Sequence, residues 1–272
     1  MWSKLNDLGV FGIAVAEQHG GSGLGVVEEV YVALQLGRSL VSPAILSTLA
    51  ASKLLPGKSR RTGLAYVARG ETIVVDEPGV EQFLVQDGGQ AMLCHIPRLD
   101  EAARDSDWSV CLHVASGPHE VIAALDEKNL LRLHLIQAAA LAGIADLATD
   151  MAVAHVKIRE QFGRPIGGFQ AVKHHCANMA IAARRACDLV SFAAMALEDA
   201  RSDRQTLVCS ALLVAGAAAV ENASKNIQLH GAMGFSDEAL PHFALKRAQL
   251  LVATAGGRDL AIERVAAIAP PN

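Results

Sequence analysis

Apolar residues follow two different rhythms along the chain, and the change between them divides it into three stretches. From about residue 131 to the end, they recur at the three- and four-residue spacing of amphipathic helices. Residues 62–130 instead carry short apolar runs separated by Gly, Pro, Asp and Asn, which is typical of strands joined by turns. Residues 26–37, before them, again have a helical pattern. The pattern therefore predicts a mainly α protein with a small β domain in its middle.

The helical part has four long amphipathic patterns with short connections, which predict an antiparallel four-helix bundle. Runs of alanine at 138–140 and 215–219 permit close approach between helices. The expected helices are Leu131–Phe162, Gln170–Ala200, Arg204–His230 and Glu238–Ala267. The expected strands are Leu64–Val67, Thr72–Val75, Gln82–Val85, Met92–Cys94, Ser109–Val114 and Val121–Ala124.

One segment, His155–Met179, joins two of these helices through a glycine- and proline-rich break at 163–168. Arg159 stands at the outgoing end of the first helix, followed by Gln161 and the aromatic Phe162. A cation there suits a bound anion. It also suits the helix end itself, where a positive charge stabilises the helix by about 0.3–1 kcal/mol.

The sequence of this segment, REQFGRPIGGFQAVKH, resembles a signature of the acyl-CoA dehydrogenases. A second segment, QLHGAMGFSDEALPHFALKRA at 228–248, resembles the other C-terminal signature of that family. The resemblance implies an FAD enzyme that forms an α,β double bond in acyl-CoA thioesters. It also implies a truncated N-terminal helical domain at 1–61, an abbreviated β domain at 62–130, and a C-terminal bundle at 131–272 that forms the FAD site and the oligomer interface.

The resemblance also implies which residues contact FAD. Arginine holds diphosphate oxygens in bidentate fashion, and the family's arginine at this place matches Arg159. Ala232 stands where the family usually has glycine. The implied cofactor-binding residues are Arg159, Gln161, Phe162, Gln170, Gln228, Leu229, Gly231 and Ala232.

The family's reaction needs a carboxylate that removes the α proton of the thioester. The two places where relatives carry this glutamate fall on Ala255 and Leu133, so no catalytic residue is predicted in this chain. Glu238 lies inside the second signature, but a carboxylate at a helix N-terminus is the simpler interpretation. Asp259 and Glu263 follow the expected position and could replace the base only if the backbone shifted.

These features favour one hypothesis over two others. The chain resembles the base-less subunit of α2β2 acyl-CoA dehydrogenases that act on steroid side-chain CoA thioesters, with a longer homologous subunit as partner. A bulky polycyclic acyl-CoA is then the expected substrate, and an electron-transfer flavoprotein the acceptor. The alternatives are a self-sufficient homo-oligomeric dehydrogenase with a displaced base, and a non-catalytic scaffold protein without flavin.

Composition and charge exclude several other classes of protein. A net charge of −4 gives no reason to expect nucleic acid or an anionic membrane as partner. The apolar run Thr206–Val220 is shorter than the roughly 20 residues of a membrane span, and the N-terminus lacks a signal-peptide pattern. We therefore expect a cytoplasmic protein. The five cysteines form no C-x-x-C pair and the histidines lack zinc-site spacing, so reduced thiols and no metal are expected.

Overall fold

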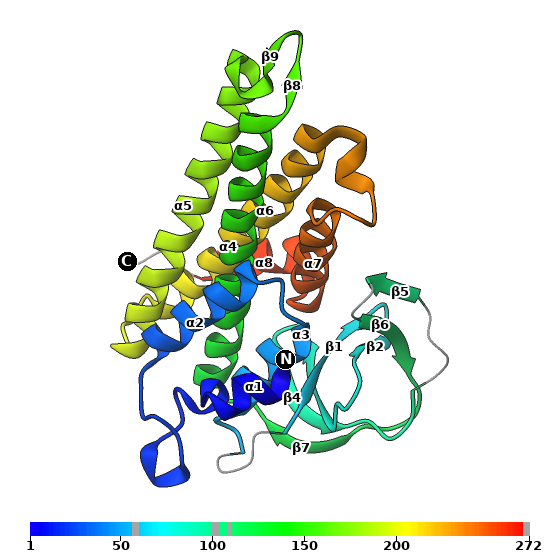
Figure 1. Ribbon diagram of the computed structural model, residues 1–272. Coiled ribbons are helices and arrows are strands. Elements are labelled where there is room, and N and C mark those ends of the chain that lie inside the picture. The colour runs from blue at the N-terminus through cyan, green and yellow to red at the C-terminus, as the bar shows by residue number, and fades with distance from the viewer. Residues whose placement is uncertain (56–59, 100–103, 108–109, 269–272) are drawn as a thin grey trace.

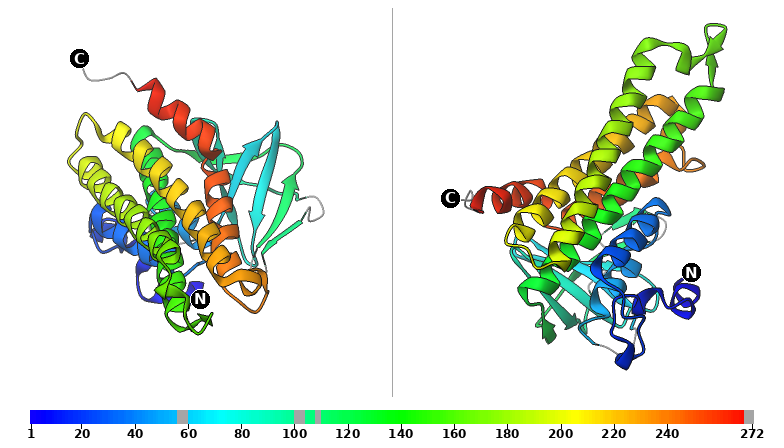
Figure 2. Two further views of the ribbon diagram at one scale, coloured as in Figure 1. Left: turned by 90° about the horizontal axis from the view of Figure 1, so that it is seen from above. Right: turned by 90° about the vertical axis from the view of Figure 1, so that its left-hand side faces the viewer.

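The computed structural model describes residues 1–55, 60–99, 104–107 and 110–268. Helices α4, α5 and α6 form a long bundle, and a β-sheet lies beside one end of it (Figure 1). A small hairpin, β8–β9, lies at the other end of the bundle, and a view from the side shows the same separation (Figure 2). The prediction of a mainly α protein with a β domain and a C-terminal bundle is confirmed.

The bundle helices end close to where the sequence predicted. The first begins four residues earlier than expected, because the Asp126 side chain accepts a hydrogen bond from Asn129 N (2.8 Å) and caps it. The alanines at 138–140 are fully buried, as the expected close packing requires. The helices of the bundle and those packed on it are α1 (Trp2–Asp7), α2 (Val26–Arg38), α3 (Pro43–Ala51), α4 (Glu127–Ile158), α5 (Gln170–Glu198), α6 (Arg204–His230), α7 (Pro241–Thr254) and α8 (Gly257–Ala267).

The fourth predicted helix, Glu238–Ala267, is wrong in its continuity. The structure has α7 and α8 instead, separated at Gly256 and Gly257, whose φ angles of +96° and +80° break the helix. Glu238 was expected at a helix N-terminus, but it lies in the turn before α7. The pattern of apolar residues therefore did not predict this break in the backbone.

The sheet is mostly antiparallel, with strands in the order β5-β6-β2-β1-β3-β4-β7 and one parallel pair, β1 and β3. One face, with Leu64, Leu84 and Leu93, joins the core of the helices, while the other has a separate small cluster around Phe83. Six strands were predicted and β5 was missed; the expected start at Ser109 lies outside the described residues. The bounds are β1 (Thr62–Ala68), β2 (Glu71–Asp76), β3 (Gln82–Asp87), β4 (Gln90–His95), β5 (Arg104–Asp107), β6 (Val110–Ala115) and β7 (Glu120–Ala124).

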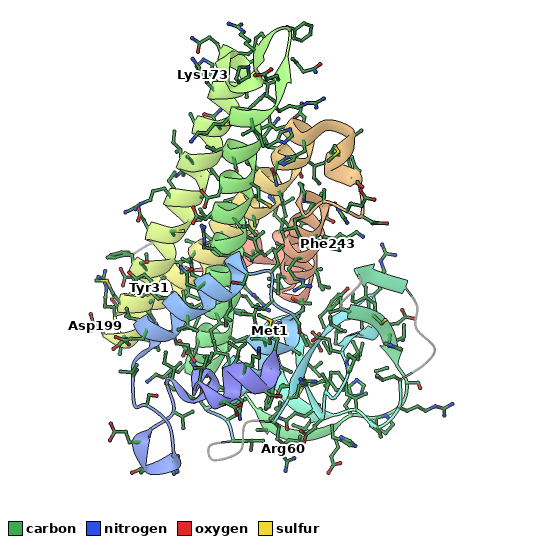
Figure 3. The ribbon with its side chains drawn as sticks, viewed as in Figure 1. Met1, Tyr31, Arg60, Lys173, Asp199 and Phe243 are labelled. Carbon is green, nitrogen blue, oxygen red and sulfur yellow. The ribbon has the colours of Figure 1, made fainter. Side chains whose placement is uncertain are left out.

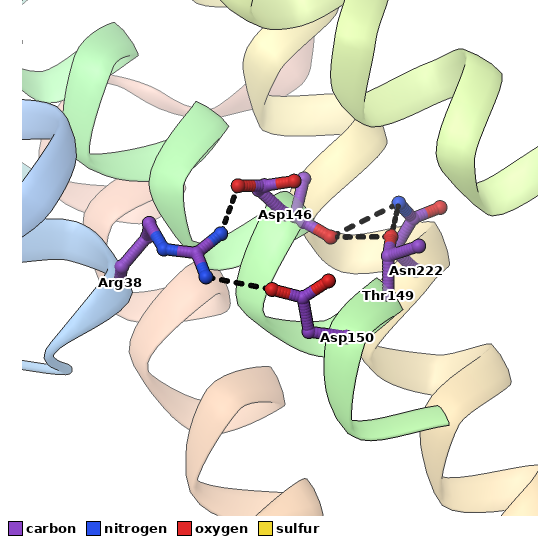
Figure 4. A network of polar contacts seen from close by, with 6 residues as sticks. Arg38, Asp146, Thr149, Asp150 and Asn222 are labelled. Carbon is purple, nitrogen blue, oxygen red and sulfur yellow. Dashed lines mark hydrogen bonds and ion pairs between the residues drawn. The ribbon is translucent and has the colours of Figure 1, made fainter. Parts of the chain in front are cut away.

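A polar network joins the helices near the middle of α4 (Figure 4). Arg38 of α2 pairs with Asp146 and Asp150 of α4, the latter at 2.6 Å. Buried Asn222 of α6 donates to Thr149 Oγ1 at 3.1 Å and to Met179 O of α5 at 2.9 Å. Buried amide donors are costly unless they are hydrogen-bonded, so these contacts fix how the four helices lie against one another.

Two helices are long and apolar enough to cross a membrane by length and composition: α4, and the stretch 204–235 that contains α6. In the first, 83% of the apolar window is buried inside the protein, and in the second 56%. Core helices of a protein fold meet the same test. The expected buried helix around Thr206–Val220 is thus part of a longer helix of the bundle.

Candidate functional site

The first signature segment forms the hairpin end of the bundle. Arg159 is the residue that ends α4, and its backbone O accepts a hydrogen bond from Ile166 N at 2.8 Å. The hairpin follows directly as β8 (Glu160–Gln161) and β9 (Arg164–Pro165). The predicted simple turn between two helices is therefore a two-stranded hairpin, so Gln161 and Phe162 lie beyond the helix rather than in it.

Phe162 occupies the turn of this hairpin in an unusual state. Its φ is +54°, followed by +74° at Gly163, which is the backbone of a tight two-residue turn. Its side chain is 91% exposed and touches Phe169 edge-on, with ring centroids 6.0 Å apart. Arg164 covers the same Phe169 ring at 4.1 Å. An exposed aromatic in a left-handed conformation gains little stability for its cost, which is typical of a contact made to something outside the chain.

The second signature segment lies close to the first. Helix α6 ends at His230, whose ring stacks on that of His155 in the last turn of α4, with centroids 4.0 Å apart. Gly231 follows with φ +63° and ψ −142°, a conformation that essentially only glycine adopts. The structure therefore brings the two signature segments together at one end of the bundle, through residues that are 75 positions apart in sequence (230 − 155).

The predicted cofactor residues sit at this end and are accessible. Figure 3 labels Lys173, in the first turns of α5, beside the hairpin, and Asp199 at the opposite end of that helix. All the predicted residues are exposed apart from one that is half-buried. The exposed residues are Arg159, Gln161, Phe162, Gln170, Gln228, Gly231 and Ala232, and the half-buried one is Leu229.

The donors in this group suit an anion. Within the described part of the chain, the Arg159 guanidinium makes no hydrogen bond or ion pair, so its charge is available. Gln228 already accepts a hydrogen bond from Lys225 Nζ at 2.7 Å. A Cβ built on Gly231 would meet nothing within 4 Å, so space is open beside its backbone. A guanidinium, amide side chains, open backbone and an aromatic ring match the phosphates and adenine of a dinucleotide.

The places where a base is expected hold no carboxylate. Ala255 directly follows α7, is 4% exposed and lines an apolar pocket of about 400 Å³. Among the described residues that line this pocket, Glu221 of α6 is the one carboxylate. Glu238, Asp259 and Glu263 are all exposed, the last two on α8.

Leu133, the second expected base position, is buried within α4. Its neighbour His134 is also buried, and burial followed by the charge of Arg264 lowers the pKa of this imidazole to about 3. An imidazole with so low a pKa is a weak base near neutral pH. His134 therefore does not replace the absent carboxylate.

Sequence reasoning missed two parts of the site. His155 was the first residue of the segment that the analysis singled out, and His230 lay inside the second signature, but only the fold shows that their rings stack. The contact of Arg164 with Phe169 depends on the β8–β9 hairpin. The glycine- and proline-rich sequence did not distinguish this hairpin from a simple turn.

Comparison with known protein families gives two matches. Residues 125–269 match the family described as acyl-CoA dehydrogenase, C-terminal domain, and residues 1–56 match acyl-CoA dehydrogenase, N-terminal domain. The first match covers more than half of the chain.

Individual relatives carry the same family name. Acyl-CoA dehydrogenase FadE34 of Mycobacterium tuberculosis is 30% identical over 98% of this chain, which spans only 42% of that relative's length. Acyl-CoA dehydrogenase IpdE2 of the same organism is 29% identical over 91% of this chain and 80% of the relative.

Solved structures show the same fold. A steroid ACAD variant, Tcur3481-Tcur3483 G363A, has a TM-score of 0.79 at 23% identity, covering 97% of this chain and 86% of that one. The ChsE4-ChsE5 complex from Mycobacterium tuberculosis has a TM-score of 0.75 at 21% identity, covering 99% and 88%.

Proposed function

Because this chain belongs to the acyl-CoA dehydrogenase family, whose members bind FAD, we propose that it is the base-less subunit of a two-subunit enzyme of this kind. In this proposal the chain contributes FAD contacts, and a longer homologous subunit supplies the catalytic carboxylate in an α2β2 assembly. The substrate is a bulky acyl-CoA such as a steroid side-chain thioester, and an electron-transfer flavoprotein accepts the electrons.

The observation that carries the proposal is the separation of the candidate cofactor residues from the sheet. Arg159 and Phe162 lie at one end of the bundle and the sheet lies beside the other (Figure 1). In the described part of a single chain, these exposed polar contacts therefore lie away from the seven-stranded sheet. Exposed residues of this kind suit a cofactor held between two subunits.

The expected chemistry divides between this chain and its partner. FAD, when bound, supplies the acceptor for the β hydrogen as hydride. Arg159 would hold phosphate oxygens, with Gln228 and the open backbone at Gly231 beside it, and Phe162 would cover the adenine end. Removal of the α proton needs a carboxylate, and Ala255 and Leu133 stand at the two places where the family resemblance implies one.

The names of the structural relatives support the substrate class and the second chain. One is described as a steroid ACAD and another as a complex of two differently named chains. Turnover of a steroid side-chain CoA thioester, compared with that of butyryl-CoA, tests the substrate class. Faster oxidation of butyryl-CoA by the two-subunit enzyme would contradict it.

Replacement of Arg159 tests the cofactor contact. Loss of a charge-assisted hydrogen bond to phosphate costs about 1.5–3 kcal/mol, so Arg159→Gln should weaken FAD binding by the assembled enzyme about 10- to 100-fold. Arg201→Gln is the control, because Arg201 is also exposed but pairs with Asp203. Equal flavin affinity in wild type and Arg159→Gln would rule out this contact.

A second candidate, the self-sufficient enzyme with a displaced base, is favoured by one observation. Glu221 lines the pocket that Ala255 also lines. If the chain alone oxidises acyl-CoA and Glu221→Gln abolishes this activity, the second candidate holds and the first is wrong.

A further inference from the structure

Two imidazole rings stand beside Arg159 at the hairpin end of the bundle. His155 lies in the last turn of α4 and His230 is the last residue of α6; their planes are 26° apart and their centroids 4.0 Å apart. Arg159 N donates to His155 O at 2.9 Å, so the backbone of the arginine is tied to that of the first histidine. The pair thus joins the two signature segments.

Hydrogen bonding fixes where a proton can be added. His230 Nδ1 lies 2.9 Å from Asn226 O, and because a carbonyl can only accept, Nδ1 carries the hydrogen. Nε2 of His230 is then the free lone pair. His155 is half-buried, and its ring has no hydrogen bond to another residue among those the structure describes. Both rings therefore keep a nitrogen that can take up a proton when an anion approaches.

The surroundings of His155 all lower the pKa of its imidazole. Burial lowers the pKa of its imidazole, and the neighbouring ring of His230 and the guanidinium of Arg159 lower it further. Those two groups are the ones that face it, one from α6 and one from the end of its own helix. No carboxylate among the described residues opposes these two groups, so the surroundings of His155 favour an anion.

We propose that the His155–His230 pair is part of the diphosphate site and takes up a proton when the cofactor binds. This rests on the proposed function, because it assigns the anion at Arg159 to the diphosphate of FAD. Two negative charges near the rings reverse the local field and favour the imidazolium form. The protonated ring then donates a charge-assisted hydrogen bond to a phosphate oxygen.

The sign of the pH dependence follows from linkage. If the pKa of His155 is higher in the complex than in the free protein, binding takes up a proton between the two values. Affinity for FAD then rises as pH falls through the bound-state pKa and levels off below the free-state pKa. A rise of one pH unit in that pKa corresponds to an affinity about tenfold higher at the acidic plateau.

The test follows the histidine rings of this chain by NMR while the pH is varied, in the assembled two-subunit enzyme without ligand, with FAD, with ADP-ribose and with riboflavin. ADP-ribose carries the diphosphate without the flavin, and riboflavin carries the flavin without phosphate. We expect FAD and ADP-ribose to raise the pKa of His155 and riboflavin to leave it unchanged. FAD affinity, measured by flavin fluorescence, should tighten about tenfold toward the acidic plateau.

Two variants separate the pair from general effects of pH. His155→Phe keeps an aromatic ring against His230 but removes a proton site, and should flatten the pH dependence of FAD binding. His95→Gln, on the exposed end of β4, should keep it. FAD binding with no change in the pKa of His155 would overturn this inference and leave the cofactor contacts standing. Absence of any response to FAD and ADP-ribose at every pH would overturn both.

Discussion

The conformation and exposure of Phe162 are not explained by a contribution to the stability of the fold. A left-handed backbone costs an ordinary residue about 1–2 kcal/mol, and the side chain is 91% exposed, so packing returns little. Glycine adopts the same φ of +54° without that cost. The sequence thus keeps an aromatic where glycine would fit the turn better.

The variant Phe162→Gly should separate stability from binding. We expect a melting temperature that is unchanged or slightly raised, because the relief of the turn offsets the lost edge contact with Phe169. We also expect a lower flavin content in the assembled enzyme. Phe169→Leu is the matched comparison and should lower the melting temperature instead, since Arg164 packs over that ring. A large loss of stability in Phe162→Gly would show that the aromatic serves the fold.

At the scale of elements, two glycines allow helix α2 to cross α4 at very short distance. A Cβ built on Gly143 would overlap Leu34 O of α2, and one on Gly37 would overlap Ala140 O of α4. Backbone atoms cannot move aside as a flexible side chain can. Close approach of these two helices therefore depends on the absence of side chains at both positions.

Gly143→Ala should destabilise the protein by about 1–3 kcal/mol or more, because overpacking at a helix crossing outweighs the gain in helix propensity. Gly216→Ala in α6 is the control, since its Cβ would meet only Val252 Cγ2 at 3.2 Å. The control should be neutral, or stabilising by up to about 1 kcal/mol. Urea unfolding of both variants measures the difference, and similar free energies of unfolding would refute the crossing argument.

The elements also show what sequence reasoning can reach. Both ends of the long helix α6 were predicted at the correct residue, because its apolar period is sustained over many turns. The break at Gly256 was missed, although two consecutive glycines with positive φ stand there. β5 was missed since its sequence, Arg104–Asp107, carries no apolar run. A sustained apolar period thus predicted helix bounds well, whereas a pair of glycines was not enough for us to predict a helix break.

The candidate site was predicted mainly from the resemblance of its sequence motifs to a family, rather than from the spacing and charge of its residues. Spacing alone left Arg159 as a charge on a helix end, and the resemblance supplied its expected partner. The stacking of His155 on His230 could not be predicted, because it requires the ends of α4 and α6 to lie side by side. Contacts between distant segments become readable only once the fold places them.

At the scale of the whole molecule, the candidate cofactor residues and the seven-stranded sheet lie at different ends of the bundle (Figure 2). This separation is the reason for our proposal that a second polypeptide completes the flavin site. Ala255 and Leu133 favour the same proposal, because both are buried apolar residues at the places where the family resemblance predicts a base.

The most direct test is the amount of flavin per chain in two preparations: this chain purified alone, and the chain co-expressed with a longer homologous subunit from the same organism. The account predicts colourless, inactive protein alone, and a yellow complex with equal numbers of the two chains that oxidises acyl-CoA. A yellow, active oligomer of this chain by itself would contradict it.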